Sequence, residues 1–275
     1  MDILSFAKID SHAHVFRANA PMIRARRYTP KKNALLADYL TNLNDLGCSK
    51  GVLIQPSFLG TDNSFLIQSI KQAANRLKGV AVVDPDISWQ QLVQLDKAQI
   101  VGIRLNVIDG IQPDLRTTIW RNLLDSIKKL NWHVEIHTRS NQLFNLVEQL
   151  INNDIRVVVD HFGRPVNYRL TEDAGFQQLM KLSASGLLWC KLSGIYRITH
   201  SKVQNQLFVS EAMPLLLENF GVQRLMWGSD WPHTQYENEI NKIYLQEQLS
   251  AMFADIQQAR TVLWDTPAQF FGFND

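Results

Sequence analysis

Short apolar runs recur along the chain, and each is followed by a longer stretch in which apolar residues return with helical spacing. The runs are rich in β-branched residues and nearly continuous in apolar character, which is typical of strands buried on both faces of a parallel sheet. Eight such runs occur, at residues 7–12, 51–55, 79–84, 101–106, 133–137, 157–161, 188–193 and 225–230.

The stretches between these runs predict helices. Pro214 could kink one of them and Pro267 could break the last, because proline lacks the N–H that a helix interior needs. Right-handed strand–helix crossovers repeated eight times close into a (β/α)8 TIM barrel, so we expect one α/β domain over residues 1–275. An open doubly wound sheet is the alternative, and it would leave the first and last strands far apart. The predicted helices span residues 33–46, 63–77, 89–98, 114–130, 141–152, 173–184, 204–220, 237–254 and 256–271.

Composition narrows the class of protein. The chain of 275 residues is 45% hydrophobic and 20% charged, as in an ordinary globular domain, and its net charge of +2 argues against nucleic acid or an anionic membrane as the main partner. Cys48 and Cys190 lack metal-ligand spacing and are expected to be buried thiols in a reducing compartment. We find neither a signal-peptide pattern nor an apolar stretch of about 18 residues, so we expect a cytoplasmic protein.

Polar side chains gather at one end of the predicted strands. His12 and His14 are two residues apart, so they point the same way from a strand. Asp230 follows the last run, which a closed ring of strands would bring beside the first. The active sites of TIM barrels lie at the C-terminal ends of the strands. The other polar residues at or just past these ends are Ser57, Asp84, Arg104, Asn106, His137, His161 and Ser193.

The candidate centre consists of His12, His14, His137, His161 and Asp230. Imidazole and carboxylate are good ligands for zinc and other divalent ions, and a bound metal would lower the pKa of its water toward 7. Without a metal, Asp230 could still act as general base on a water held by the histidines. Both mechanisms give hydrolysis of an ester-like bond, and the alternative is that the histidines are ordinary polar residues at strand ends.

Three arginines lie at matching strand ends: Arg104, Arg164 and Arg197. Guanidinium groups bind carboxylates bidentately, so they favour a small anionic substrate. The alternative is that they are solvated or pair with carboxylates of the protein itself. Residues 16–32 form a long basic loop that could cover the site as a lid, with Tyr28 donating a hydrogen bond to the substrate.

Together these residues resemble the amidohydrolase superfamily, and within it the branch of 2-pyrone-4,6-dicarboxylate lactonase and related sugar or muconolactone lactonases. The motifs follow in order from the first strand to the C-terminus, so the likeness covers essentially the whole chain. They begin with His12-Ala13-His14-Val15-Phe16, Gln55-Pro56-Ser57, Gly102-Ile103-Arg104-Leu105-Asn106 and Asp160-His161-Phe162-Gly163-Arg164-Pro165. They continue with Lys191-Leu192-Ser193-Gly194, Trp227-Gly228-Ser229-Asp230-Trp231-Pro232-His233 and the ending Asp265-Thr266-Pro267.

The resemblance implies a barrel hydrolase that opens a lactone, with Asp230 activating water. His12, His14 and His161 would polarise the lactone carbonyl or hold one divalent metal ion, zinc first of all, because members of the branch differ in whether they use a metal. Positions that hold substrate carboxylates correspond to Tyr28, Ser57, Arg104 and Arg197.

Two departures from the family pattern stand out. No bridging lysine is evident near the fourth strand, which argues against a binuclear centre. His137 replaces an aromatic or neutral polar residue, and it is a further possible ligand or substrate contact. A metal-dependent decarboxylase of the same superfamily and a ligand-binding barrel without catalysis are the competing hypotheses. The oligomeric state stays open.

Overall fold

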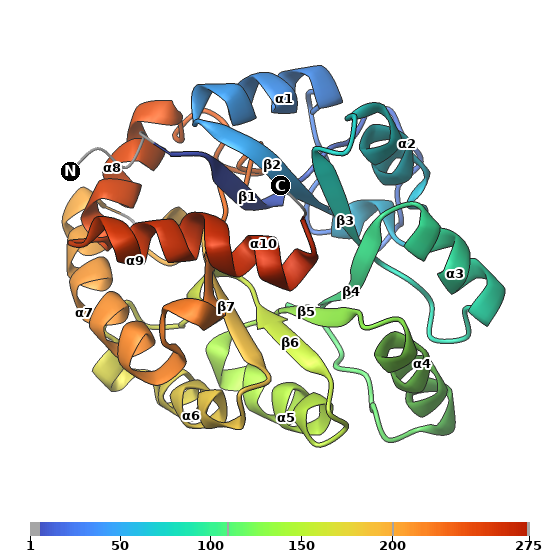
Figure 1. The fold of residues 1–275 in the computed structure, drawn as a ribbon. Coiled ribbons are helices and arrows are strands. Elements are labelled where there is room, and N and C mark those ends of the chain that lie inside the picture. The colour runs from blue at the N-terminus through green and yellow to red at the C-terminus, as the bar shows by residue number, and fades with distance from the viewer. Residues whose placement is uncertain (1–5, 109, 200, 274–275) are drawn as a thin grey trace.

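Eight parallel strands form one sheet in the order of the sequence in the computed structural model, which describes residues 6–108, 110–199 and 201–273 (Figure 1). Each strand pairs with the next one along the chain, as expected when every connection is a right-handed crossover. The strands are β1 Lys8–Ala13, β2 Cys48–Ile54, β3 Leu77–Ala81, β4 Ile100–Asn106, β5 His133–His137, β6 Arg156–Val159, β7 Leu188–Leu192 and β8 Leu225–Trp227.

The first and last strands meet, and this closes the barrel. Ala13 forms a parallel bridge with Trp231, and the backbone N–H of His14 donates to the Trp231 carbonyl oxygen at 2.7 Å. The backbone N–H of Asp230 donates to the His12 carbonyl oxygen at 2.8 Å. The open doubly wound alternative is therefore excluded, and the TIM barrel prediction is confirmed.

Helices surround the strands because each buries one apolar face against them. In α4, for example, Leu123, Leu124 and Ile127 are buried while the opposite face carries charged residues. The helices are α1 Leu36–Asp45, α2 Ser64–Gln72, α3 Trp89–Lys97, α4 Thr118–Lys129, α5 Ser140–Ile151, α6 Ala174–Leu182, α7 Lys202–Phe220, α8 Lys242–Met252, α9 Ile256–Arg260 and α10 Thr266–Phe271.

Neither proline noted in the sequence ends its helix. Helix α7 continues through Pro214. No break occurs at Pro267 either, since a π-helical segment, Thr261–Asp265, joins α9 to α10 and places Pro267 in the first turn of α10, where a missing N–H costs little. The predicted helix 237–254 begins only at Lys242. The last predicted strand, 225–230, ends at Trp227, so Asp230 lies in the loop that follows β8.

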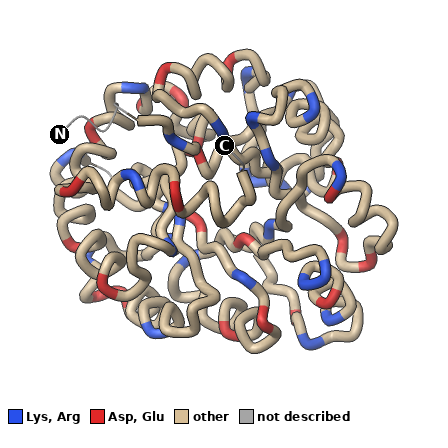
Figure 2. Tube along the Cα trace, in the orientation of Figure 1, with Lys and Arg blue, Asp and Glu red and all other residues tan. Residues whose placement is uncertain are grey.

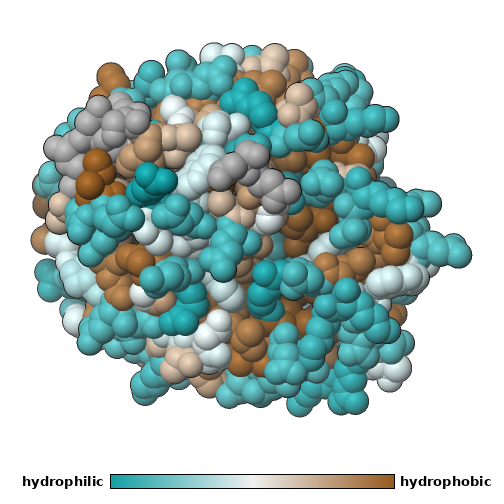
Figure 3. All heavy atoms as spheres, in the orientation of Figure 1, coloured by the Kyte–Doolittle hydropathy of each residue, from teal (hydrophilic) through white to brown (hydrophobic). Residues whose placement is uncertain are grey.

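The end of the barrel opposite the candidate site is closed by α10, which crosses it in Figure 1. Phe270 and Phe271 of α10 pack against the ring of His133 at the start of β5, with centroids 5.0 and 5.6 Å apart. His133 is therefore a structural residue. On this face charged residues of both signs are interspersed along the outer elements (Figure 2), and hydrophobic residues appear in small patches between hydrophilic ones (Figure 3).

Cys48 and Cys190 are buried free thiols, as predicted. In the described part of the chain, the search for a helix with the length and apolar character of a membrane span finds none.

Candidate active site

A pocket opens at the C-terminal ends of the strands, and it gathers nine of the ten site residues predicted from the sequence. The tenth, His12, is fully buried behind the pocket wall. The loop between β1 and α1 adds Arg27 to the lining. The predicted residues that line the pocket are His14, Tyr28, Ser57, Arg104, His137, His161, Arg164, Arg197 and Asp230.

Asp230 lies at the bottom of this pocket, and its two carboxylate oxygens have different surroundings. Oδ2 accepts hydrogen bonds from the Tyr196 hydroxyl at 2.7 Å and from Arg197 Nε at 2.6 Å. Oδ1 has no hydrogen-bond partner and lies 3.6 Å from His14 Nε2 and 3.9 Å from His12 Nε2. Although burial raises the pKa of Asp230, the charge of Arg197 holds it well below its usual range. Asp230 is therefore ionised. Its Oδ2 is hydrogen-bonded to Tyr196 and Arg197, and its Oδ1 has no hydrogen-bond partner.

The backbone around Asp230 is fixed to β1 by Asp10, a residue that the sequence analysis did not assign. Asp10 accepts hydrogen bonds from the backbone N–H and the hydroxyl of Ser229, at 2.8 and 2.6 Å. Tyr39 donates to the same carboxylate at 3.2 Å. Gly228 permits this approach, because a Cβ there would lie 2.5 Å from the Cβ of His12. The acid from the last strand is thus held beside the histidines of the first.

Several residues of the site have left-handed backbone conformations, which are uncommon for side chains other than glycine. The φ angles of His161, Arg164, Asp230 and His233 are +51°, +50°, +60° and +63°. Such conformations cost about 1–3 kcal/mol each and persist where the surrounding structure enforces them. Each of them turns the chain just past a strand, and the side chains of His161, Arg164 and Asp230 line the pocket.

The histidines differ in what holds their rings. His14 Nδ1 lies 2.8 Å from the Ile54 carbonyl oxygen, which can only accept, so Nδ1 carries the hydrogen and neutral His14 presents a lone pair at Nε2. His161 Nδ1 lies 2.8 Å from the Ser193 hydroxyl, and burial lowers the pKa of His161 to about 3. Both ring nitrogens of His137 are buried without a hydrogen-bond partner, so they are available to a ligand.

The arginines are less available than the sequence suggested. Arg104 donates from Nε and Nη2 to Asp160 Oδ2, at 3.0 and 2.7 Å, and Arg197 binds Asp230. For both, the alternative interpretation of pairing with a carboxylate of the protein describes the structure, although both still line the pocket. Arg164 binds the Arg197 carbonyl oxygen, and its buried Nε has no partner. Burial and the nearby Arg197 lower the pKa of Arg164 to about 10.

A group of charged residues inside the barrel was missed by the sequence analysis. Glu135 of β5 and Lys191 of β7 form a fully buried ion pair, and Asp160, just past β6, lies beside them. We call Arg104, Glu135, Asp160 and Lys191 the inner cluster. A signal was present, because Glu135 stands between His133 and His137 at two-residue spacing, so all three side chains point to one face of β5.

The centre contains donor sets that suit a metal ion. Among the described residues, His12, His14 and Asp230 each offer a ligand atom, and these atoms lie within 4.8 Å of one another. His12, Asp160 and His161 form a second such group, whereas His137 belongs to neither. The unpartnered His12 Nε2 and Asp230 Oδ1 are the orphaned buried atoms that a cation would satisfy. These residues can therefore hold one divalent ion when the ring hydrogen of His12 lies on Nδ1, so that Nε2 offers a lone pair.

The long loop after β1 reaches the pocket, as expected for a lid. Its two ends are pinned together by backbone hydrogen bonds between Phe16 and Ala34, at 2.8 and 2.9 Å. Tyr28 donates a hydrogen bond to Glu237 in the loop after β8. Arg27 donates to Asn106 at the end of β4, at 3.3 Å. Opening and closing of this loop stays a prediction.

Comparisons with known proteins agree with this geometry. The 4-sulfomuconolactone hydrolase of Rhizobium radiobacter is 30% identical over 270 residues, covering 96% of this chain and 89% of that protein. A candidate 2-pyrone-4,6-dicarboxylic acid hydrolase from Pseudomonas putida superposes with a TM-score of 0.91 at 40% identity, over 98% of both chains. A similar candidate from Acinetobacter baumannii, solved with citric acid bound, gives a TM-score of 0.92 at 35% identity over 98% of this chain and 100% of that chain. The sequence profile of the family described as amidohydrolase matches residues 9–273, so this chain belongs to the amidohydrolase family.

Proposed function

We propose that this protein is an enzyme that hydrolyses the ester bond of a small lactone carrying anionic groups. The observation that carries the proposal is a pair of acceptors in the pocket, Asp230 Oδ1, which has no hydrogen-bond partner, and His14 Nε2, which lies 3.6 Å from it. Two acceptors at this separation are within reach of one water molecule that donates a hydrogen to each. The names of the similar proteins, a sulfomuconolactone hydrolase and pyrone dicarboxylate hydrolases, support a lactone as substrate.

In this arrangement the water is ready for general base catalysis. Both of its hydrogens face acceptors, so a lone pair of its oxygen is free to attack the lactone carbonyl carbon. Asp230 takes one proton as the new C–O bond forms, and His161 in the pocket wall faces the developing negative charge on the carbonyl oxygen. The tetrahedral intermediate collapses by breaking the ring C–O bond. The proton on Asp230 passes to the leaving oxygen, which yields the open hydroxy or keto acid.

The charge of the pocket supports an anionic substrate. Asp230 is the only acid in the described lining, against Arg27, Arg104, Arg164 and Arg197. Asp160 and Asp230 neutralise two of these arginines, so Arg164 with its unpartnered Nε is the strongest candidate for a carboxylate or sulfonate of the substrate. We assign His137, Ser57 and Tyr28 to further polar contacts with the substrate.

A divalent ion, if bound, would be held by His12, His14 and Asp230 and would lower the pKa of a bound water. Zinc is the best match to two imidazoles and a carboxylate.

The variant Asp230→Asn tests the proposal. The amide cannot accept the proton, so we expect ring opening to slow by at least about 10²-fold, measured as loss of lactone absorbance with a panel of carboxylated and sulfonated lactones. Asp114→Asn on the surface is the control and should keep full activity, and circular dichroism should show that both variants fold. Full activity of Asp230→Asn, or release of CO2 in place of ring opening, would contradict the proposal.

A further inference from the structure

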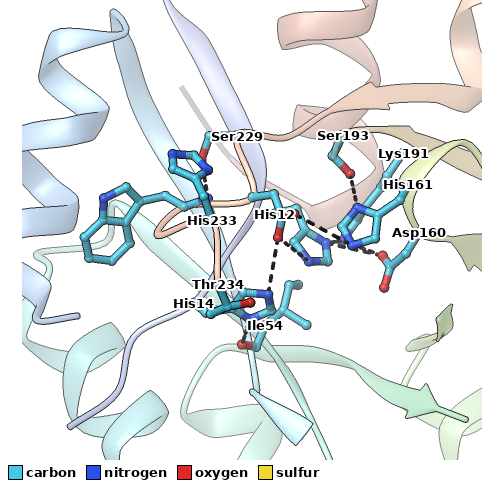
Figure 4. A network of polar contacts seen from close by, with 12 residues as sticks. His12, His14, Ile54, Asp160, His161, Lys191, Ser193, Ser229, His233 and Thr234 are labelled. Atoms are coloured by element: carbon cyan, nitrogen blue, oxygen red, sulfur yellow. Dashed lines mark hydrogen bonds and ion pairs between the residues drawn. The ribbon is translucent and has the colours of Figure 1, made fainter. Parts of the chain in front are cut away.

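His12 is the predicted site residue that the pocket does not expose, and its ring lies beside Lys191 and Asp160 of the inner cluster (Figure 4). Three charged groups surround this nitrogen: Lys191 Nζ at 3.3 Å, Asp160 Oδ1 at 3.2 Å and Glu135 Oε1 at 3.5 Å. All of these side chains are fully buried or nearly so, so water does not take part in the choice among them. The inner cluster therefore decides which nitrogen of His12 carries the hydrogen.

The geometry favours Lys191 as the partner. The contact between Lys191 Nζ and His12 Nδ1 has hydrogen-bond geometry, whereas Asp160 Oδ1 and Glu135 Oε1 form no hydrogen bond. An ammonium group can only donate, so His12 Nδ1 must accept. The hydrogen of the neutral ring then lies on Nε2, which points toward Asp230 Oδ1 at 3.9 Å. Lys191 is itself held by its ion pair with Glu135.

His12 of β1 and His14, which follows the strand, therefore carry their ring hydrogens on different nitrogens. The Ile54 carbonyl oxygen accepts from His14 Nδ1, so His14 directs a lone pair at the centre. Lys191 donates to His12 Nδ1, so His12 directs a hydrogen at the centre. A metal ion needs a lone pair from every imidazole that binds it, and the partner of the second ring nitrogen determines whether one is offered.

We propose that Lys191 is a positioning residue that keeps the hydrogen of His12 on Nε2, and that it thereby makes the centre favour a water molecule over a divalent metal ion. The assignment of the water to lactone hydrolysis rests on the proposed function, whereas the position of the hydrogen and the metal preference do not. Without Lys191, the hydrogen would move to Nδ1 and be accepted by Asp160 Oδ1, and His12, His14 and Asp230 would then present three lone pairs together.

The test uses the double variant Lys191→Met with Glu135→Gln, which removes the ion pair without leaving a buried charge. Lys8→Met is the matched control, because Lys8 is an equally buried lysine on β1 that donates to the Phe6 carbonyl oxygen, away from the centre. Two quantities are measured on apoprotein: the tautomer of His12, by NMR of protein with ¹⁵N-labelled histidine, and zinc affinity, by calorimetric titration. The seven histidines are assigned with single substitutions.

In the wild type and in Lys8→Met we expect the hydrogen on His12 Nε2 and the same weak zinc affinity. In the double variant we expect the hydrogen on Nδ1 and zinc binding that is tighter by about 10- to 100-fold, the range found for changes in groups that orient metal ligands. Hydrogen on Nδ1 in the wild type would overturn the proposal even if the double variant failed to fold. So would an unchanged zinc affinity in a folded double variant. Failure of every lactone as substrate would contradict the proposed function alone, because neither measurement depends on turnover.

Discussion

The residues that line the pocket and those of the inner cluster lie in the same barrel, but their charges are balanced differently. In the inner cluster, the acids Glu135 and Asp160 face the bases Arg104 and Lys191, so positive and negative charges match within the protein. Apart from Arg104, which is balanced by Asp160, three arginines of the described pocket lining, Arg27, Arg164 and Arg197, face the single acid Asp230. The comparison separates two roles: the inner cluster supports the fold and orients His12, and the wall keeps an excess of positive charge for an anion from outside.

The largest effect is expected from breaking the inner cluster. Arg104→Met leaves Asp160 buried without the guanidinium that donates two hydrogen bonds to its Oδ2, so we expect the free energy of unfolding to fall by about 3–5 kcal/mol, measured by urea denaturation. Arg116→Met removes an exposed ion pair with Asp114 and should change stability by less than about 1 kcal/mol. Adding Asp160→Asn to Arg104→Met should recover much of the loss. Equal effects of the two single variants would show that the inner cluster carries no more stability than the surface.

The next effect concerns Asp10, which joins β1 to the loop that carries Asp230. Burial raises its pKa from 3.8 to about 6, despite hydrogen bonds from Ser229. The folded state therefore holds the proton more tightly than the unfolded state. The stability from this proton is complete below pH 4 and is lost as the pH rises through 6, a fall of about 3 kcal/mol for this group. Chemical denaturation of the wild type and Asp10→Asn between pH 4 and 7 should show curves that converge or cross, and parallel curves would rule this out.

In the pocket wall, Arg164 should affect binding more than stability. Arg164→Gln removes the guanidinium assigned to the anionic group of the substrate, so we expect KM to rise by about 10- to 100-fold with little change in kcat. Arg139→Gln is the matched control, because Arg139 is exposed on the same side of β5 and β6 but does not line the pocket. Steady-state kinetics with the best lactone of the panel measures both. An equal KM for the two variants would remove Arg164 from the substrate site.

The smallest effect is expected at the edge of the pocket. Tyr28→Phe removes one neutral hydroxyl that reaches Glu237 across the loops, so KM should rise only about 3- to 10-fold. The same kinetic assay measures it, with Tyr168→Phe outside the pocket as the control. An unchanged KM would indicate that Tyr28 holds the loop to Glu237 without touching the substrate.

The barrel and the place of the site followed from the sequence because both depend on local patterns. Apolar runs and helical periodicity predicted the eight strands and their order. Polar residues at strand ends, together with Tyr28 of the long basic loop, predicted nine of the residues that line the pocket. Strand ends were less well predicted. The predicted strand 225–230 ends at Trp227, because residues 228–230 are Gly, Ser and Asp and hydrogen bonds from Ser229 to Asp10 draw the chain out of the strand.

The partners of the charged residues could not be predicted in the same way. Arg104 binds Asp160 from a strand two positions further along the barrel, and no spacing in the sequence records such a contact. Lys191 and Glu135 lie inside apolar strands where a buried ion pair and an exposed pair of charges look alike in sequence. Sequence patterns thus located the candidate residues, while the division of the arginines between protein and substrate needed coordinates.

The hydrogen bonds between Asp10 and Ser229 have a consequence for folding during synthesis. Asp10 and Ser229 are 219 residues apart, so Asp230 and its two imidazole neighbours meet only after the loop that follows β8 has been synthesised. Catalytic activity would then appear only when the segment that follows β8 pairs with β1 and closes the barrel. Ribosome-bound nascent chains of increasing length should show no lactone hydrolysis until β8 and the loop that follows it have left the exit tunnel.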